Sequence, residues 1–279
     1  MSTSVTNSME ARFCTIDGLK IRYADSGGSH RSTFLLTSPW PESIYAFASV
    51  WTTLAQHARV FAVDLPGFGA SDRRDDLLSP RGMGGFLARL IADADLGPVH
   101  IVGPDVGTSA ALFAAAEYPD RFSSLIVGSG AAAVPLEVGQ SLMSKILDPD
   151  LDEYRATDSR ITVGELLDTI AGGLPDEIRD DYLNCYSGVR YVESMRYVRR
   201  YPDELPVLAD LLPGIAIPTT IINGRHDRIV PASNAVFLAE RLPDSHLTLI
   251  DAAHFVWEEA PKEYASAVLQ ALDRKAKRG

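Results

Sequence analysis

The ten residues IVGPDVGTSA, at positions 101–110, decide how the rest of the chain is interpreted. An apolar run ends at Gly103 and Pro104, Asp105 follows, and small residues after Gly107 predict the start of a helix. Strand, tight turn, one reactive side chain and helix form the pattern of a nucleophile elbow, which normally carries serine. The sequence therefore poses one chemical question, which is what an aspartate does at that point.

Short apolar runs recur along the chain and predict strands that are buried on both faces of a parallel sheet. These runs are FLLT (34–37), VFAVD (60–64), VHIVG (99–103), LIVGS (125–129), TTIING (219–224) and LTLID (247–251). Helical segments such as 86–95 and 108–117 lie between them, so the alternation predicts an α/β fold with a mostly parallel, doubly wound sheet. Two further runs, 12–16 and 19–25, predict an antiparallel edge hairpin that turns at Asp17-Gly18.

The strand–helix rhythm stops between residues 134 and 211. That segment is rich in charge, Tyr and Met, and contains helix-like stretches such as 163–171 and 189–200. It is too long for a loop and too poor in strand patterns to continue the sheet. We therefore expect a helical cap at 134–211, inserted into a core formed by 1–133 and 212–279.

Composition excludes several classes of function. The 279 residues carry a formal net charge of −11 and a sequence pI near 5.0, which argues against binding to nucleic acid or to an anionic membrane surface. Cys14 and Cys185 lie far apart and fit free thiols in a reducing compartment. The N-terminus lacks the apolar core of a signal peptide and no stretch is long enough to span a bilayer, so we expect a cytoplasmic protein. The sequence implies no metal or organic cofactor, because it has no ligand cluster and no phosphate-binding glycine loop.

Three candidate catalytic residues follow three predicted strands. Asp105 follows VHIVG, Asp227 follows TTIING within GRHDRIVP, and His254 follows LTLID within AAHFVWEEAP. Ligands of open α/β sheets bind beyond the carboxyl ends of the strands, so these side chains are expected to meet. The order nucleophile, acid, histidine is the chain order of the α/β-hydrolase triad.

With these residues in place, the chain resembles the α/β-hydrolase superfamily over nearly its whole length. It is most similar to the branch of epoxide hydrolases and haloalkane dehalogenases, which share an aspartate at the elbow. DLPGFGASD (64–72) resembles the glycine-rich segment of that group, and SPWPES (38–43) resembles the HGxPES stretch that supplies an oxyanion-hole amide. The usual His-Gly is Ser38-Pro39 here, which puts the geometry of the oxyanion hole in question.

An aspartate at the elbow suits attack on a saturated carbon. A carboxylate is ionised at neutral pH, whereas serine needs a neighbouring base to lose its proton. Attack by Asp105 would form an alkyl ester, and His254, oriented by Asp227, would then activate water to hydrolyse it. The expected oxyanion-hole donors are the backbone N–H groups of Val106 and Trp40.

The leaving group decides between related reactions. Epoxide opening produces an alkoxide that needs a proton donor, and epoxide hydrolases use cap tyrosines for this. The resemblance favours Tyr197 and Tyr154, with Tyr186 and Tyr191 as rivals; Tyr182 and Tyr201 also fall in the cap.

Dehalogenation is the second hypothesis. Haloalkane dehalogenases carry Trp directly after the nucleophile and Asn at the position of Trp40, and haloacid-type relatives carry Arg after the elbow aspartate. This chain has Val106 after the elbow aspartate, so epoxide hydrolysis leads. A ligand-binding relative without turnover is the third hypothesis.

The expected partner is a small-molecule substrate. The cap is rich in apolar side chains, which favours an apolar or aromatic compound, whereas its arginines leave room for an acidic group. These arginines are Arg190, Arg196, Arg199 and Arg200. No nucleic-acid or membrane partner is expected, and the sequence leaves open whether the chain forms a homodimer.

Overall fold

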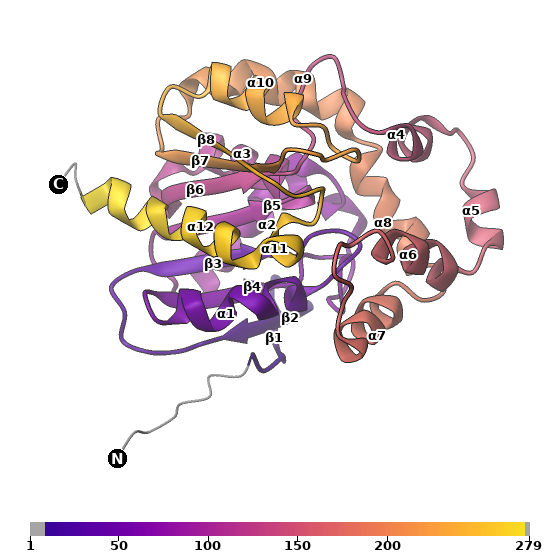
Figure 1. Cartoon of the computed structure of the whole chain (residues 1–279), viewed down its shortest axis with the longest axis horizontal. Coiled ribbons are helices and arrows are strands. Elements are labelled where there is room, and N and C mark those ends of the chain that lie inside the picture. Colours follow the sequence, from indigo (N-terminus) through magenta and orange to yellow (C-terminus); the bar gives the residue numbers. More distant parts are fainter. Residues whose placement is uncertain (1–8, 277–279) are drawn as a thin grey trace.

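The computed structural model describes residues 9–276, which form one eight-stranded sheet with helices on both faces (Figure 1). The strand order is β1-β2-β4-β3-β5-β6-β7-β8. The strands are β1 (Arg12–Ile16), β2 (Leu19–Asp25), β3 (Thr33–Thr37), β4 (Arg59–Val63), β5 (Val99–Pro104), β6 (Phe122–Gly128), β7 (Thr219–Gly224) and β8 (Ser245–Ile250).

The sheet is parallel from β4 to β8, and only β1 and β2 run antiparallel to their neighbours. β3, β5 and β7 are buried at every residue, which explains why their sequences are rich in apolar residues instead of alternating. The predicted edge hairpin is confirmed, with its turn at Asp17 and Gly18, both of which have positive φ. The predicted α/β fold with a mostly parallel sheet is therefore confirmed.

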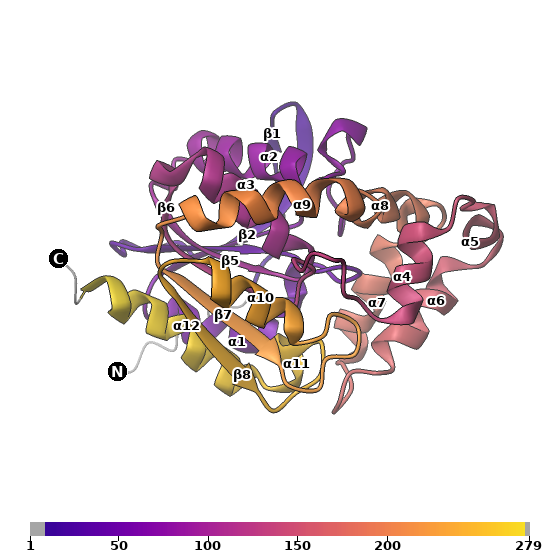
Figure 2. The same ribbon diagram turned by 90° about the horizontal axis from the view of Figure 1, so that it is seen from above.

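Two layers of helices cover the sheet (Figure 2). α2 and α3 pack together on one face, and α1 and α12 pack together on the other. The helices that flank the sheet are α1 (Ala48–Ala55), α2 (Pro80–Asp93), α3 (Val106–Glu117), α10 (Ser233–Arg241), α11 (Val256–Glu259) and α12 (Pro261–Ala276). The α2 helix begins earlier than the predicted segment 86–95, because the Ser79 hydroxyl accepts from the Gly82 N–H and Pro80 occupies the first turn.

Six helices and no strand occur between β6 and β7 in this fully described part of the chain. They are α4 (Gln140–Leu147), α5 (Asp152–Ala156), α6 (Ser159–Leu167), α7 (Asp176–Cys185), α8 (Arg190–Val198) and α9 (Tyr201–Leu211). Figures 1 and 2 show α4 to α8 gathered beyond one end of the sheet, while α9 returns along α2 and α3. We call the segment 134–211 the cap.

A buried ion pair joins the cap to the sheet. Arg22 on β2 donates to Asp64 after β4 and, through both terminal nitrogens, to Asp181 on α7, at 2.7 and 3.0 Å. Two-point contacts between guanidinium and carboxylate fix geometry as well as charge. This pairing holds α7 against the core.

Within residues 9–276, no helix combines the length and apolar character needed to cross a bilayer, and no group of side chains has the arrangement of a metal site. Both cysteines are free thiols. The first part of the N-terminal stretch used to assign localisation, residues 1–8, lies outside the described residues.

Candidate active site

The nucleophile elbow is the turn between β5 and α3. Asp105 adopts φ 52° and ψ −122°, a backbone conformation that side-chain-bearing residues rarely occupy. The strain is tolerated because small residues surround it: a Cβ on Gly107 would come within 2.2 Å of Thr37 Oγ1, and one on Gly130 within 2.3 Å of the Asp105 carbonyl oxygen. Strain of this kind concentrates at functional sites. The turn presents the Asp105 side chain beyond the end of the sheet.

A backbone amide holds one oxygen of the Asp105 carboxylate. The Trp40 N–H, in the loop after β3, donates to Asp105 Oδ2 at 2.6 Å. The Val106 backbone N–H lies near enough to the Asp105 carboxyl to lower its pKa. Pro39 has no N–H of its own, but it leaves the Trp40 N–H directed at Asp105, and the Trp40-Pro41 peptide is cis. The Ser38-Pro39 departure therefore leaves the Trp40 amide donor in place.

The buried Asp64 carboxylate holds the loop after β3 in place. Its Oδ1 accepts from the Ile44 N–H at 2.7 Å and its Oδ2 from the Ala70 N–H at 2.8 Å, which links the SPWPES loop to the glycine-rich segment 64–72. Gly69 has φ +50°, and a Cβ there would meet the Asp64 carboxylate at 2.1 Å. The glycine is required because backbone and buried carboxylate approach closely.

The structure brings His254 and Asp227 to the elbow. The His254 Nδ1 lies 2.8 Å from Asp227 Oδ2, and its Nε2 lies 3.8 Å from Asp105 Oδ1. Asp227 Oδ1 accepts from the N–H groups of Ile229 and Val230, both at 2.8 Å, so this carboxylate is fixed in place. Asp105, Asp227 and His254 thus form a buried, connected set of three side chains from three strand ends.

Burial and mutual charge set the protonation of this set. Burial raises the pKa of the Asp105 carboxyl above its usual range, against the opposing effects of His254 and of the Trp40 and Val106 amides. Burial lowers the pKa of His254, but the two carboxylates Asp227 and Asp105 outweigh it, so that pKa lies above its ordinary value of 6.5. An imidazole held by two carboxylates favours its protonated form.

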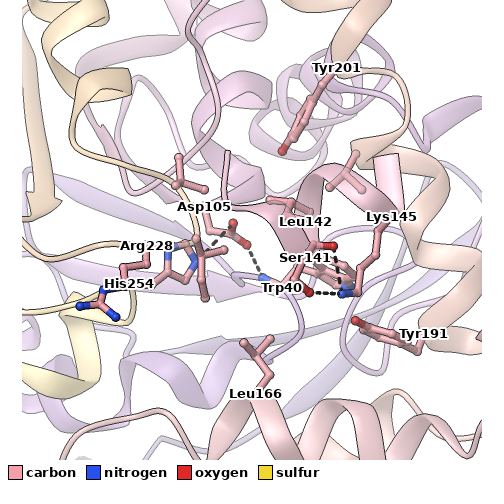
Figure 3. A pocket seen from close by; sticks show the side chains of 14 residues that line it. Trp40, Asp105, Ser141, Leu142, Lys145, Leu166, Tyr191, Tyr201, Arg228 and His254 are labelled. Carbon is pink, nitrogen blue, oxygen red and sulfur yellow. Dashed lines mark hydrogen bonds and ion pairs between the residues drawn. The ribbon is translucent and has the colours of Figure 1, made fainter. Parts of the chain in front are cut away.

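A cavity of about 130 Å³ lies beside Asp105 and His254, between core and cap (Figure 3). Its lining comes from the core loops and from cap helices α4, α6, α8 and α9. The cap contributes Gly139, Ser141, Leu142, Lys145, Leu166, Tyr191, Val198 and Tyr201. The other lining residues are Trp40, Asp105, Arg228, Ile229, Val230 and His254. The cavity therefore combines a mostly apolar wall with Asp105 and His254.

The structure does not bring Tyr197 and Tyr154 to this cavity. Tyr197 is fully buried against α3, where its hydroxyl donates to the Val106 carbonyl oxygen at 2.6 Å and lies 3.2 Å from Ser109 Oγ. Tyr154 on α5 is half-buried and is not a lining residue. Sequence position relative to the return strand cannot distinguish these places, because α8 turns each successive residue by about 100°.

Two other cap tyrosines do line the cavity. Tyr191 on α8 stacks on the Trp40 ring, with centroids 5.3 Å apart and planes 9° from parallel. Tyr201 at the start of α9 directs its hydroxyl toward Asp105 in Figure 3. Burial raises the pKa of both phenols, and for Tyr201 the neighbouring Tyr197 and Asp105 add to the effect. Both hydroxyls are therefore neutral proton donors over the physiological range.

The remaining tyrosines named as candidates hold the cap in place. Tyr182 donates to Glu258 Oε1 at 2.8 Å, and the Tyr186 hydroxyl accepts from the Gly69 N–H at 3.1 Å. Neither lines the cavity.

The alpha/beta hydrolase fold family matches residues 33–261. A 2-hydroxy-6-oxononadienedioate/2-hydroxy-6-oxononatrienedioate hydrolase of Burkholderia vietnamiensis is 26% identical to this chain. The match spans 96% of this chain and 98% of that hydrolase. A 2-hydroxy-6-oxo-6-(2'-aminophenyl)hexa-2,4-dienoic acid hydrolase of Metapseudomonas resinovorans is 23% identical, over 95% of this chain and 91% of its own.

Solved structures share the fold at low identity. The epoxide hydrolase CorEH superimposes with a TM-score of 0.81 at 19% identity, covering 95% of this chain and 99% of that one. Cfl2 of Burkholderia cenocepacia gives a TM-score of 0.82 at 23% identity, covering 93% and 94%. With a family match across most of its length and a hydrolase as a full-length relative, the chain belongs to the α/β hydrolase fold family.

Proposed function

We propose that this hydrolase opens epoxides to vicinal diols through a covalent ester on Asp105. Asp105 Oδ1, the oxygen nearer His254, attacks a ring carbon of the epoxide while Oδ2 stays bound to the Trp40 amide. The carbon–oxygen bond of the ring breaks, and the leaving alkoxide takes a proton from a tyrosine hydroxyl. Water then adds to the ester carbonyl carbon and gives a proton to His254, and the developing oxyanion falls at Oδ2, where the Trp40 amide already points. Collapse of this intermediate breaks the bond between the acyl carbon and Oδ1, and the leaving alkoxide takes the proton from His254 to release the diol. The remaining carboxyl proton returns to the tyrosinate through solvent, which restores Asp105 and the tyrosine.

The observation that carries this proposal is the identity and setting of the elbow residue. The family motif places serine there, and this chain places a buried carboxylate within reach of an imidazole and two amides. A carboxylate nucleophile forms an alkyl ester when it displaces a leaving group from a saturated carbon, and that ester needs the histidine–acid pair for its hydrolysis. All of these groups occur together in this site.

The cavity wall favours an epoxide over a halide. The Trp40 indole N–H, which belongs to a residue lining the cavity, donates to Ser194 Oγ at 2.8 Å and is not available for a halide ion. Tyr191 and Tyr201 supply neutral hydroxyl donors instead, as an alkoxide leaving group requires. The roles first expected of Tyr197 and Tyr154 are therefore proposed for Tyr191 and Tyr201.

We expect Tyr191→Phe and Tyr201→Phe each to slow epoxide opening by about 10-fold to 100-fold, and the double variant by more, because general acid catalysis contributes about 10² to 10⁴. Single-turnover alkylation rates measure this step directly. Tyr197→Phe removes a hydroxyl from α8, the helix that also carries Tyr191, but outside the cavity, and serves as the matched control. Alkylation that slows in Tyr197→Phe alone would contradict the new assignment.

The ester-hydrolysis step should show an acid limb in its pH profile that follows the protonation of His254. His254 must be neutral to act as base, and Asp227 raises the pKa at which it loses its proton, whereas Asp105 is uncharged once it is esterified. Activity in this step therefore falls as the pH drops through the pKa of His254. Asp227→Asn removes one raising charge and should move the limb to lower pH while lowering the plateau. Asp251→Asn, at the exposed His226–Asp251 pair, should leave the profile in place.

The proposal as a whole is tested by a substrate panel. Epoxides, haloalkanes, simple esters and the oxo-dienoic acids named for the relatives are offered to the purified protein, and diol, halide, alcohol or cleaved acid is measured. Diol release with the highest kcat/KM supports the proposal. Turnover of esters or oxo-dienoic acids alone would place the carboxylate in another reaction, and halide release alone would favour dehalogenation.

A further inference from the structure

The cavity contains a cation that the chemistry at Asp105 does not use. Lys145 on α4 lines the wall opposite the elbow loops, and Figure 3 shows its side chain running from the helix into the cavity. Its ammonium group donates to the hydroxyl of Ser141 at 2.8 Å and to the Ser141 carbonyl oxygen at 3.3 Å. Among the side chains that the structure describes, no carboxylate forms an ion pair with Lys145, although the sequence carries 37 acidic and 26 basic side chains.

The position of Lys145 is fixed from both ends of its helix. At the start of α4, the Gly139 N–H donates to the Ile229 carbonyl oxygen at 2.8 Å, which ties the helix to the loop that carries Asp227. At its end, Arg199 on α8 donates to the Lys145 carbonyl oxygen at 3.1 Å. The helix is therefore held against both the catalytic loop and α8, and the lysine is presented to the cavity rather than to a mobile surface.

Among the charged side chains that line the cavity, Lys145 has no carboxylate as a counter-ion. Asp105 is the only carboxylate among the lining residues, and it is already paired with His254 and the two amides. Besides His254, which is paired with Asp227 and Asp105, the basic lining residues are Lys145 and Arg228, and the Arg228 guanidinium points away from Asp105 in Figure 3. Burial alone lowers the pKa of Lys145, with no neighbouring carboxylate to offset it. A partly buried ammonium without a counter-ion is stabilised by a ligand that brings one.

We propose that Lys145, with the Ser141 hydroxyl as a second donor, binds a carboxylate group of the substrate. This inference rests on the proposed function and narrows it: the substrate is an epoxide whose electrophilic carbon and carboxylate lie a few bonds apart. The cavity of about 130 Å³ limits it to a small molecule, since engineered cavities of about 150 Å³ hold benzene. Lys145 is a specificity-determining residue here, and the bond-making step remains that of Asp105.

Glycidate and its neutral amide, glycidamide, provide a matched substrate pair, because they differ mainly in one charge. The quantity measured is the ratio of their kcat/KM values. We expect Lys145→Met to lower this ratio about tenfold, as loss of a charge-assisted hydrogen bond does, mainly through KM for glycidate. Lys145→Arg keeps the charge and should retain most of the ratio. Lys262→Met, the same substitution at an exposed site on α12, should leave it unchanged.

An unchanged ratio in Lys145→Met overturns the inference, as does equal loss for both substrates, which would indicate a packing role. A binding measurement separates this failure from failure of the proposed function. If the wild-type protein opens neither epoxide, calorimetry with propionate and propionamide still tests the anchor. Tighter binding of propionate that disappears in Lys145→Met supports it, and equal binding of the two probes by the wild-type protein rejects it.

Discussion

Asp105→Asn should abolish epoxide turnover, with a loss of kcat of at least about 10⁴-fold, comparable to removal of the nucleophile in other covalent hydrolases. The substitution keeps the size of the side chain and an acceptor for the Trp40 N–H, but the amide cannot form the ester with a saturated carbon. The measurement is diol formation under multiple-turnover conditions. No adduct should appear on this variant, because the bond-forming oxygen is gone.

The interpretation of this variant requires that the fold is intact. Asp105 is buried with its charge balanced by His254 and two amides, so the neutral amide leaves no uncompensated negative charge, and thermal unfolding should show a native-like transition. Asp251→Asn makes the same chemical change on the exposed surface and should retain wild-type kcat. Wild-type turnover by Asp105→Asn would transfer the reaction to another residue and end the covalent proposal.

The fold could be predicted from the sequence because its strands carry the signal themselves. β5 and β7 are buried along their full length, so VHIVG and TTIING are rich in apolar residues and do not alternate between apolar and polar. The hairpin turn could be predicted from Asp17-Gly18, because these residue types tolerate the positive φ that the turn requires. The starts of helices were harder to predict: α2 begins at Pro80, after the N-cap Ser79, and this start lies upstream of the most apolar part of its sequence.

The site residues of the core could also be predicted from the sequence, whereas the site residues of the cap could not. Asp105, Asp227 and His254 each follow a strand, and parallel topology alone brings strand ends together. The cap contains no parallel strands whose ends would bring particular residues together. Whether Tyr197 or Tyr201 faces the cavity depends on how α8 and α9 pack on α3, and Tyr197 is turned instead toward the Val106 carbonyl oxygen. A resemblance in sequence position could not resolve a rotation about the helix axis.

The role proposed for Lys145 likewise could not be predicted from the sequence. A lone lysine at i+4 from a serine on an amphipathic helix reads as an ordinary solvated side chain. Only the placement of α4 against the Asp227 loop and α8 makes it a lining residue of a cavity whose one carboxylate is already paired. The missing counter-ion is a property of the assembled site, so no local sequence pattern contains it.

His254→Gln should let the first half-reaction proceed and stop the second, so that the enzyme accumulates as an ester on Asp105. Glutamine occupies similar space but cannot accept a proton from water at neutral pH, and ester hydrolysis should slow by at least about 10³-fold. Intact-mass spectrometry after mixing with an epoxide should show the protein heavier by the full mass of the substrate. A halide substrate would instead add the substrate mass less that of the hydrogen halide, so the same spectrum distinguishes the two leaving groups.

Peptide mapping should place this adduct on Asp105, and a labelling experiment on the wild-type protein tests the same step from the other side. In a single turnover in heavy-oxygen water, the ester route attaches an Asp105 oxygen to the product and leaves a solvent oxygen in the Asp105 carboxylate. Direct attack by a histidine-activated water would put the heavy oxygen into the diol and leave Asp105 unlabelled. The geometry favours the first result, because Asp105 Oδ2 already lies 2.6 Å from the Trp40 N–H, where the oxyanion of ester hydrolysis would be stabilised. A labelled diol from the first turnover, with no adduct in His254→Gln, would make Asp105 a spectator and leave His254 as base for a one-step hydrolysis.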